Sequence, residues 1–410
     1  MVRARWISAS TRRAVERVGG MSTSSYRYLD AAATAPLRAE AREALIAALD
    51  AGPGNASSVH TAGHRAASTV QEARERIAGV FGVAQNELVF TSGGTEANNL
   101  AVIGLALANP RGRHIVTSAI EHPSVEESCR FLERLHGFEV TRVRVDGDGR
   151  VDPAEAVAAV RADTALVTIG LANGEIGTVQ PLGEIAAAVR SSGALMHSDA
   201  VQAAATLPVS LAAGGWPGGA IDAMSVASHK FGGPQGVGAL LLRAGLPVEP
   251  VLHGGGQEHG LRSGTENVAA IAGFAAAVSA TARSIGTRAA ALAASRDELI
   301  RRVLAEVPGA ALTGHPSERL PGHASFVVDG VSGESLLVAL DAAGIAASSG
   351  SACAAGKDEP SPVLTAVGIP PQLAQTALRF TLPEAIDDSL IERIVRVLVR
   401  ETATASAKRA

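Results

Sequence analysis

Short β-branched runs alternate with alanine-rich stretches from about residue 85 to residue 245. The runs predict seven strands, and helical stretches such as Thr95–Ala108 and Pro181–Ser191 lie between most of them. The predicted strands are Glu87–Thr91, His114–Ser118, Glu139–Arg144, Ala165–Ile169, Ala194–His197, Ala223–Val226 and Val237–Leu242. This alternation is typical of a mostly parallel α/β sheet, which binds its ligands at the carboxyl ends of the strands.

The pattern changes in the last third of the chain. A long alanine-rich helix is predicted over Ala270–Leu304, where it could connect the sheet to a second unit. Beyond it, Ala324–Val328 and Leu378–Leu382 read as strands and Glu334–Ala343 reads as a helix. These elements predict a small α+β domain.

We expect two domains, because 410 residues exceed the usual size of one hydrophobic core. The predicted large domain is 40–285, residues 21–39 and 286–400 form the small one, and 401–410 are a C-terminal tail. Residues 1–20 contain five arginines but no long apolar run, so they do not resemble a secretory signal. We interpret them as a disordered extension, with an organelle transit peptide as the alternative.

Composition narrows the classes of function. The net charge of −4 gives no electrostatic reason to expect nucleic acid as a partner, and no apolar run reaches the length of about 18 residues that a membrane span needs. The two cysteines, Cys129 and Cys353, cannot build a disulfide framework, and they lie too far apart for a CxxC-type metal site. We therefore expect a cytoplasmic protein without a metal.

The sequence SGGTEANN, residues 92–99, follows a predicted strand and opens a predicted helix. Glycines let the backbone approach an anion closely, and the free N–H groups of a helix start supply donors. Gly94 and Thr95 are therefore candidate phosphate ligands. The alternative is a purely structural turn, because strand-to-helix turns are often rich in glycine.

Two further strand ends carry a carboxylate and an amine. Asp199, in HSDAVQ, could keep a pyridine nitrogen protonated and so make the ring an electron sink, or it could simply cap a helix. Lys230, in SHKFGGP, ends the next predicted strand and could form a Schiff base with an aldehyde cofactor, or it could be a solvated surface lysine. Neighbouring strands would present both groups at one edge of the sheet.

A histidine also stands at a strand end. His122, in EHP, could stack on a cofactor ring or move protons. A purely structural histidine is the alternative.

Together these motifs resemble one family. The ordered set SGGTEANN, EHP, NGEIGT, HSDAVQA, SHKFGGPQGVGAL, HGGGQEHGLRSGTENVA and SSGSACAAG is similar to the cysteine desulfurases of class-V aminotransferase type, over roughly residues 26–400. The resemblance implies a fold-type-I pyridoxal-phosphate transferase, with a mostly parallel seven-stranded sheet in the large domain and a small α+β domain. The SSGSAC form resembles the housekeeping iron–sulfur branch.

The resemblance also implies a reaction. L-cysteine would become L-alanine, with the sulfur held as a persulfide on Cys353 for an acceptor such as an iron–sulfur scaffold. Lys230 would be the Schiff-base lysine, which also takes the α-proton. The substrate would be held by Asn173 and by Arg379, whose guanidinium fork suits a carboxylate.

The cofactor residues that the resemblance implies come from several motifs. Asp199 matches the partner of the pyridine nitrogen, Gln202 the neighbour of the phenolic oxygen, and His122 the stacking residue. The phosphate would be bound by Gly94, Thr95, Ser228 and His229, and by Thr265 of the other subunit of a homodimer.

Three positions depart from the family pattern. Ala31 and Gly174 stand where the family commonly has polar side chains, and Ala227 stands where it often has a serine, although Ser228 is adjacent. The changes at 31 and 174 bear on how the substrate is positioned. The alternatives are a selenocysteine lyase, another class-V enzyme such as an aminotransferase, and a non-catalytic relative that binds partners.

Overall fold

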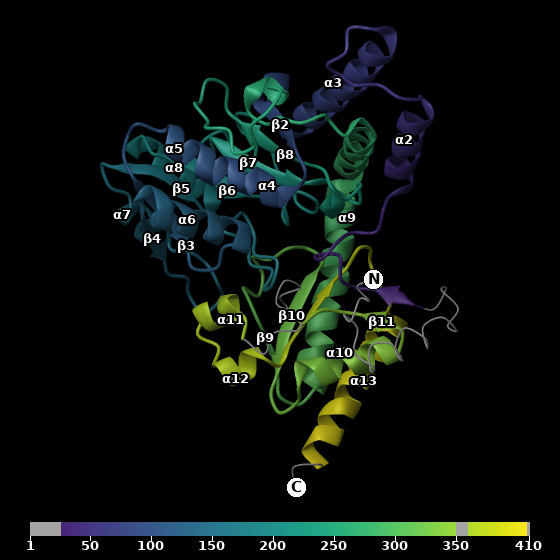
Figure 1. Cartoon of the computed structure of the whole chain (residues 1–410). Coiled ribbons are helices and arrows are strands. Elements are labelled where there is room, and N and C mark those ends of the chain that lie inside the picture. Colours follow the sequence, from purple (N-terminus) through teal and green to yellow (C-terminus); the bar gives the residue numbers. More distant parts are fainter. Residues whose placement is uncertain (1–25, 350–359, 408–410) are drawn as a thin grey trace, which may run out of the picture.

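The computed structural model describes residues 26–349 and 360–407 (Figure 1). The predicted N-terminal extension and the catalytic-cysteine candidate Cys353 lie outside the described residues. Figure 1 shows a larger α/β part and a smaller part around a second sheet.

A seven-stranded sheet forms the larger part. Its strands are β2 (Leu88–Thr91), β3 (His114–Ser118), β4 (Glu139–Val143), β5 (Thr164–Thr168), β6 (Leu195–Asp199), β7 (Ala223–Ala227) and β8 (Gly238–Leu242). The order is β2-β8-β7-β6-β5-β3-β4, and only β8 runs antiparallel to its neighbours. The predicted mostly parallel seven-stranded sheet is confirmed, with strand ends displaced by one or two residues.

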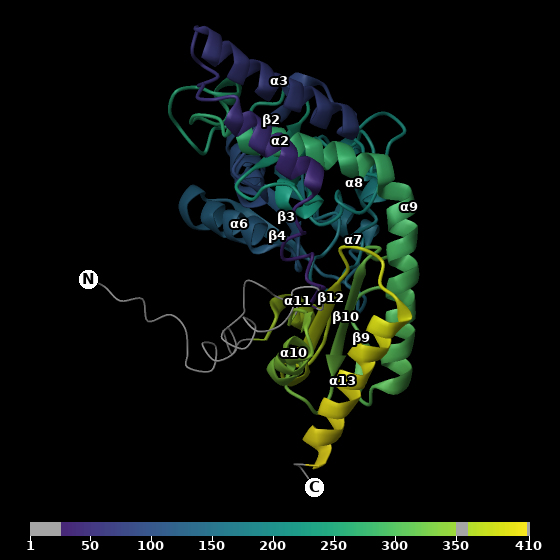
Figure 2. The ribbon, with the colours of Figure 1, turned by 90° about the vertical axis from the view of Figure 1, so that its right-hand side faces the viewer.

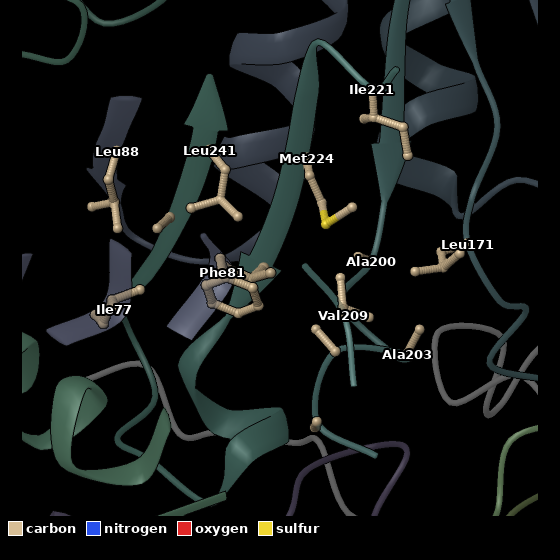
Figure 3. Packing of buried hydrophobic residues seen from close by; sticks show 14 of the residues in the cluster. Ile77, Phe81, Leu88, Leu171, Ala200, Ala203, Val209, Ile221, Met224 and Leu241 are labelled. Atoms are coloured by element: carbon tan, nitrogen blue, oxygen red, sulfur yellow. The ribbon is translucent and has the colours of Figure 1, made fainter. Parts of the chain in front are cut away.

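The inner strands of this sheet are buried on both faces, which favours largely apolar residues in them. The edge strand β4 is partly exposed and carries Glu139 and Arg142. Alternate residues face opposite cores: Ile115 and Leu166 pack on one side, and Val116 and Val167 on the other. Figure 3 shows the core on the side of Val116 and Val167, where Phe81 packs near the sheet. The covering helices are α3 (Thr61–Phe81), α6 (Pro123–His136), α7 (Pro153–Ala158), α8 (Leu182–Ser192) and a run of α4 (Gly94–Asn99), η2 (Leu100–Gly104) and α5 (Leu105–Ala108).

The run Gly94–Ala108 was predicted as one helix over Thr95–Ala108. It is helical throughout, but its middle part, η2, is a π-helical turn. Short 3-10 turns follow other strands and loops: η1 (Gln85–Glu87), η3 (Ser228–Phe231) and η4 (Glu258–Gly260).

The smaller part has an antiparallel three-stranded sheet of order β12-β10-β9. Its elements are β9 (Ala310–Leu312), β10 (His323–Val328), α10 (Gly333–Ala342), α11 (Pro362–Ala366), α12 (Pro371–Ala374), β12 (Ala377–Thr381) and α13 (Asp388–Ala407). The N-terminal strand β1 (Arg27–Tyr28) pairs with β11 (Ile345–Ala346), so the start of the described chain lies beside its C-terminal part. The predicted C-terminal tail begins too early, because α13 continues to Ala407 and buries Thr402.

Helix α9 (Val268–Glu306) runs alongside both parts (Figure 2). Near its start it contributes Phe274 and Val278 to the core of the large sheet, beside helix α2 (Ala39–Asp50) and α3. Near its end it contributes Leu299 and Val303 to the core of the small sheet. By length and composition alone α9 could cross a membrane, but half of its apolar stretch is buried inside the protein.

Candidate active site

A cavity of about 370 Å³ opens at the carboxyl edge of the large sheet, next to the small sheet. It is lined by residues of both parts, including Asp199 and Lys230 from one and Arg379 from the other. Among the predicted site residues, Gly94, Thr95, His122, Asn173, Asp199, Gln202, His229, Lys230 and Arg379 line it. The described residues contain no group of three or more His, Cys, Asp or Glu that could hold a metal ion.

Asp199 and Lys230 come to one edge because β6 and β7 are parallel neighbours. One carboxylate oxygen of Asp199, Oδ1, accepts from the backbone N–H of Val201 at 2.9 Å, as a helix cap would. The other, Oδ2, accepts from the side-chain amide of Asn98 at 2.6 Å. The carboxylate is thus fixed at the cavity wall.

Lys230 projects from η3, directly after β7, and its ammonium donates to the carbonyl oxygens of Ala32 and Ala33. Arginine supplies almost all other positive charge in this chain, which has only two further lysines, Lys357 and Lys408. A guanidinium stays protonated at any ordinary pH, whereas a lysine amine can lose its proton and act as a base or nucleophile. The only lysine within the described residues therefore lies where such a group is needed.

His122 caps the N-terminus of α6. Its Nδ1 accepts from the backbone N–H of Ser124 at 3.1 Å and lies 2.7 Å from the hydroxyl of Ser124. The imidazole faces the open cavity, yet desolvation by the surrounding protein lowers the pKa of His122, and Lys230 lowers it further while Asp199 opposes this. The ring is therefore held neutral.

Glu121 lies beneath the same part of the cavity. Its carboxyl accepts from the Ser118 hydroxyl at 2.5 Å and from the backbone N–H of Gly170 at 3.0 Å. Burial nevertheless raises the pKa of Glu121 to about 7, and the nearby Asp199 adds to the rise.

The start of α4 and residue His229 form the end of the cavity that suits an anion. A Cβ on Gly94 would lie 2.6 Å from Cγ2 of Val201, so this position has room only for glycine. Burial lowers the pKa of His229 to about 4, with Lys230 contributing, and its Nδ1 lies 3.3 Å from the hydroxyl of Thr34. A neutral His229 can still donate one N–H to an anion.

Two predicted phosphate ligands lie elsewhere. Ser228 does not line the cavity, which corrects its assignment: Ala227 lines it, and the buried hydroxyl of Ser228 faces Gly233, where an added Cβ would lie 2.2 Å away. Adjacent residues at the end of β7 point to opposite sides, so the neighbouring serine does not replace a side chain at 227. Thr265 is exposed and outside this chain's own cavity.

Arg379 of β12 (Ala377–Thr381) lines the cavity from the small sheet. Its Nη1 donates to the carbonyl of Gly174 at 2.9 Å and its Nη2 to Oδ1 of Asp30 at 2.9 Å. Asn173 shapes this loop, since its amide donates to Ile120 and its Oδ1 accepts from the backbone N–H of Glu175 at 2.8 Å.

Gln202 occupies the space beside Gly174. A Cβ on Gly174 would lie 2.9 Å from Nε2 of Gln202, and this Nε2 donates to the carbonyl of Ala32 at 3.0 Å. The missing side chain at 174 is thus matched by a glutamine that fills its place.

Several side chains of the site were not predicted from the sequence, among them Asp30, Asn98, Glu121 and Ser124. Asn98 lies within SGGTEANN and Ser124 directly follows EHP, so both were inside recognised motifs and could have been considered. Asp30 carries no such signal, because its partner Arg379 lies 349 residues away in the chain.

Comparison with known proteins identifies the family. The family model for aminotransferase class-V matches residues 27–389. The cysteine desulfurase IscS of Dictyoglomus turgidum is 44% identical over 356 residues, which cover 87% of this chain and 89% of that protein. The IscS-like cysteine desulfurase of Mycobacterium tuberculosis is 42% identical over 390 residues, 93% of this chain and 97% of that protein.

Solved structures agree. A NifS-like protein superimposes with a TM-score of 0.84 at 32% identity, covering 92% of this chain and 100% of that one. A structure described as SspA in complex with cysteine gives a TM-score of 0.75 at 31% identity, covering 88% and 100%. The resemblance in the motifs therefore extends over the whole fold, and the chain belongs to the class-V aminotransferase family.

Proposed function

We propose that this protein is a cysteine desulfurase, which converts L-cysteine to L-alanine and holds the sulfur as a persulfide on Cys353. The observation that carries the proposal is one cavity that brings Lys230, Asp199 and Arg379 together from two sheets. Relatives that match over most of their length are named cysteine desulfurases, and a neighbouring structure is described as a complex with cysteine.

We propose pyridoxal 5′-phosphate as the cofactor. The residues present fit it: a glycine-dependent helix start with Thr95 and His229 would hold the phosphate, and Asp199 would hold the pyridine nitrogen. His122 would stack on the ring, Gln202 would lie near its phenolic oxygen, and Lys230 would bind its aldehyde. When bound, the cofactor supplies an electron sink for charge that develops at the substrate α-carbon.

Side chains of the protein bind the substrate, transfer the proton and accept the sulfur. Arg379, oriented by Asp30, binds the substrate carboxylate, and Lys230 takes the α-proton. The thiolate of Cys353 attacks the substrate sulfur, so that an S–S bond forms and the C–S bond breaks. The electron pair of the broken bond ends in a new C–H bond, which completes alanine.

We further propose a homodimer that passes its sulfur to an acceptor protein such as an iron–sulfur scaffold, in the cytoplasm. Thr265 supports the dimer, because it is exposed and has no place in its own cavity. Two cysteines in 410 residues support a reducing compartment.

One incubation tests the activity. The purified protein with L-cysteine and a reducing thiol should release alanine and sulfide in equal amounts. Pyruvate and ammonia in place of alanine would indicate elimination and refute the desulfurase mechanism.

The lysine content makes the cofactor test sharp. Borohydride should attach pyridoxal phosphate to Lys230, and mass spectrometry of peptides distinguishes this site from the other two lysines, Lys357 and Lys408. A label on either of these would overturn the assignment of Lys230.

A further inference from the structure

Hydrogen bonds connect Asp199 to His122 through two side chains that no motif role explains. The amide nitrogen of Asn98 donates to Oδ2 of Asp199 at 2.6 Å and to the hydroxyl oxygen of Ser124 at 2.9 Å. The same hydroxyl lies 2.7 Å from Nδ1 of His122. Asn98 and Ser124 are both buried, which shields these bonds from water.

The positions of the protons follow from donor counting. An amide nitrogen has two N–H groups, and Asn98 uses one on Asp199 and one on Ser124. The hydroxyl of Ser124 therefore acts as acceptor toward Asn98 and has its own proton left for Nδ1 of His122.

A second donor points to the same nitrogen. The backbone N–H of Ser124, at the start of α6, also donates to Nδ1 of His122, at 3.1 Å. A nitrogen that accepts from two donors carries no proton, so in the neutral ring the proton is on Nε2.

We propose that Asn98 and Ser124 are positioning residues that hold His122 as the Nε2–H tautomer, so that His122 donates a hydrogen bond or proton into the cavity and does not act as a base there. The tautomer follows from the hydrogen bonds alone, whereas its use in turnover depends on the proposed desulfurase function. Lys230 is then the base of the site. His122 donates its Nε2–H to groups of the substrate or cofactor that gain negative charge or take up a proton.

Charged neighbours bear on this assignment. Asp199 and Lys230 act on His122 with opposite signs, and Glu121 precedes it in the chain. A proton on Nδ1 would face two donors at the start of α6. The hydrogen bonds through Asn98 and Ser124 therefore disfavour both the doubly protonated ring and the Nδ1–H tautomer of His122.

The first measurement needs no turnover. Protein with ¹⁵N-labelled histidine is examined by NMR with and without added pyridoxal phosphate, and His122→Gln identifies the signal of His122. The expected result is an unprotonated Nδ1 and a protonated Nε2 in the wild type. A protonated Nδ1 in the neutral ring would overturn the proposal, whether or not the protein desulfurates cysteine.

Variants test the hydrogen bonds that Ser124 makes to His122. Ser124→Ala removes one of the two donors to Nδ1, so an NMR titration should show a higher pKa for His122, and kcat with cysteine should fall about fivefold to tenfold with little change in KM. Ser124→Thr, which retains the hydroxyl, should restore both. Ser128→Ala is the matched control, because it removes a buried hydroxyl from the same helix that donates to the Ser124 carbonyl and does not contact His122. An unchanged pKa of His122 in Ser124→Ala, or an equal change of this pKa in Ser128→Ala, would refute the positioning role of Ser124.

Discussion

Asp30 and Arg379 form an ion pair across 349 residues of sequence, with Oδ1 of the aspartate 2.9 Å from Nη2 of the arginine. The arginine side chain is only 4% exposed and the aspartate 18%. The pair joins the N-terminal segment to β12 at the wall of the cavity. It thereby fixes the guanidinium before a substrate arrives.

Asp30→Asn should raise KM for cysteine about tenfold with a smaller effect on kcat, because the arginine loses its orienting charge. The buried guanidinium also loses a charged partner, and we expect about 2 kcal/mol less free energy of unfolding. Steady-state kinetics and urea denaturation measure the two effects. Glu298→Gln, which breaks an exposed pair with Arg301 on α9, should change neither. A normal KM in Asp30→Asn would show that the arginine is held by other contacts.

Cys353→Ser should lower sulfide and alanine release at least about a hundredfold while pyridoxal-phosphate binding stays unchanged, since a serine hydroxyl is scarcely ionised at neutral pH. Product assays and absorbance titration follow the two properties. The control is Cys129→Ala: Cys129 is buried, burial raises the pKa of its thiol, and turnover should not change. Turnover retained by Cys353→Ser would refute a persulfide on this residue.

Glu121 should make stability depend on pH. Its pKa rises from 4.5 to about 7 on folding, so the folded state favours the protonated carboxyl. This contribution is fully present below about pH 4.5 and is lost as the pH rises to about 7, with an upper limit of about 3 kcal/mol.

Urea denaturation at pH 5 and pH 8 measures that contribution. Glu121→Gln should be more stable than the wild type at pH 8 by up to this amount, and the advantage should shrink at pH 5. Glu127→Gln, at an exposed position of α6, controls for the loss of one carboxylate. An advantage that is the same at both pH values would contradict the assignment.

Gly174→Ala should weaken binding of pyridoxal phosphate about fivefold. The new Cβ would lie 2.9 Å from Nε2 of Gln202, so the glutamine must move and give up its hydrogen bond to Ala32. Cofactor titration by absorbance measures the change. Gly79→Ala, on the exposed side of α3 with no atom within 4 Å of the new Cβ, should leave the affinity unaltered. Affinity equal to the wild type would mean that Gln202 has another position of equal energy.

The sequence predicted the large sheet well because most of its strands are buried, largely apolar runs bounded by turns, and such runs are local signals. The residues at the strand ends followed from the same logic, as Asp199 and Lys230 illustrate. The local sequence does not indicate toward which side of the sheet a side chain at a strand end points. Ser228 therefore appeared equivalent to a donor at 227, although its hydroxyl faces the other way.

Long-range partners were also beyond the sequence. Nothing near Asp30 indicates Arg379, and nothing near Gly174 indicates that Gln202 fills the space beside it. The family pattern alone indicates that position 174 can carry a polar side chain. In the structure it has to displace an existing side chain.

Helix α9 also joins the two parts of the molecule whose residues line the cavity. Its start belongs to the core behind Lys230 and its end to the core behind Arg379, so a single helix of 39 residues is anchored in both parts that line the cavity. Between these anchored ends the helix carries Gly286, whose Cβ position is open to solvent with no atom within 4 Å. A glycine at mid-rod is a point of low bending stiffness. The one helix that joins the two walls therefore has, between its anchored ends, a position with no side chain to support it.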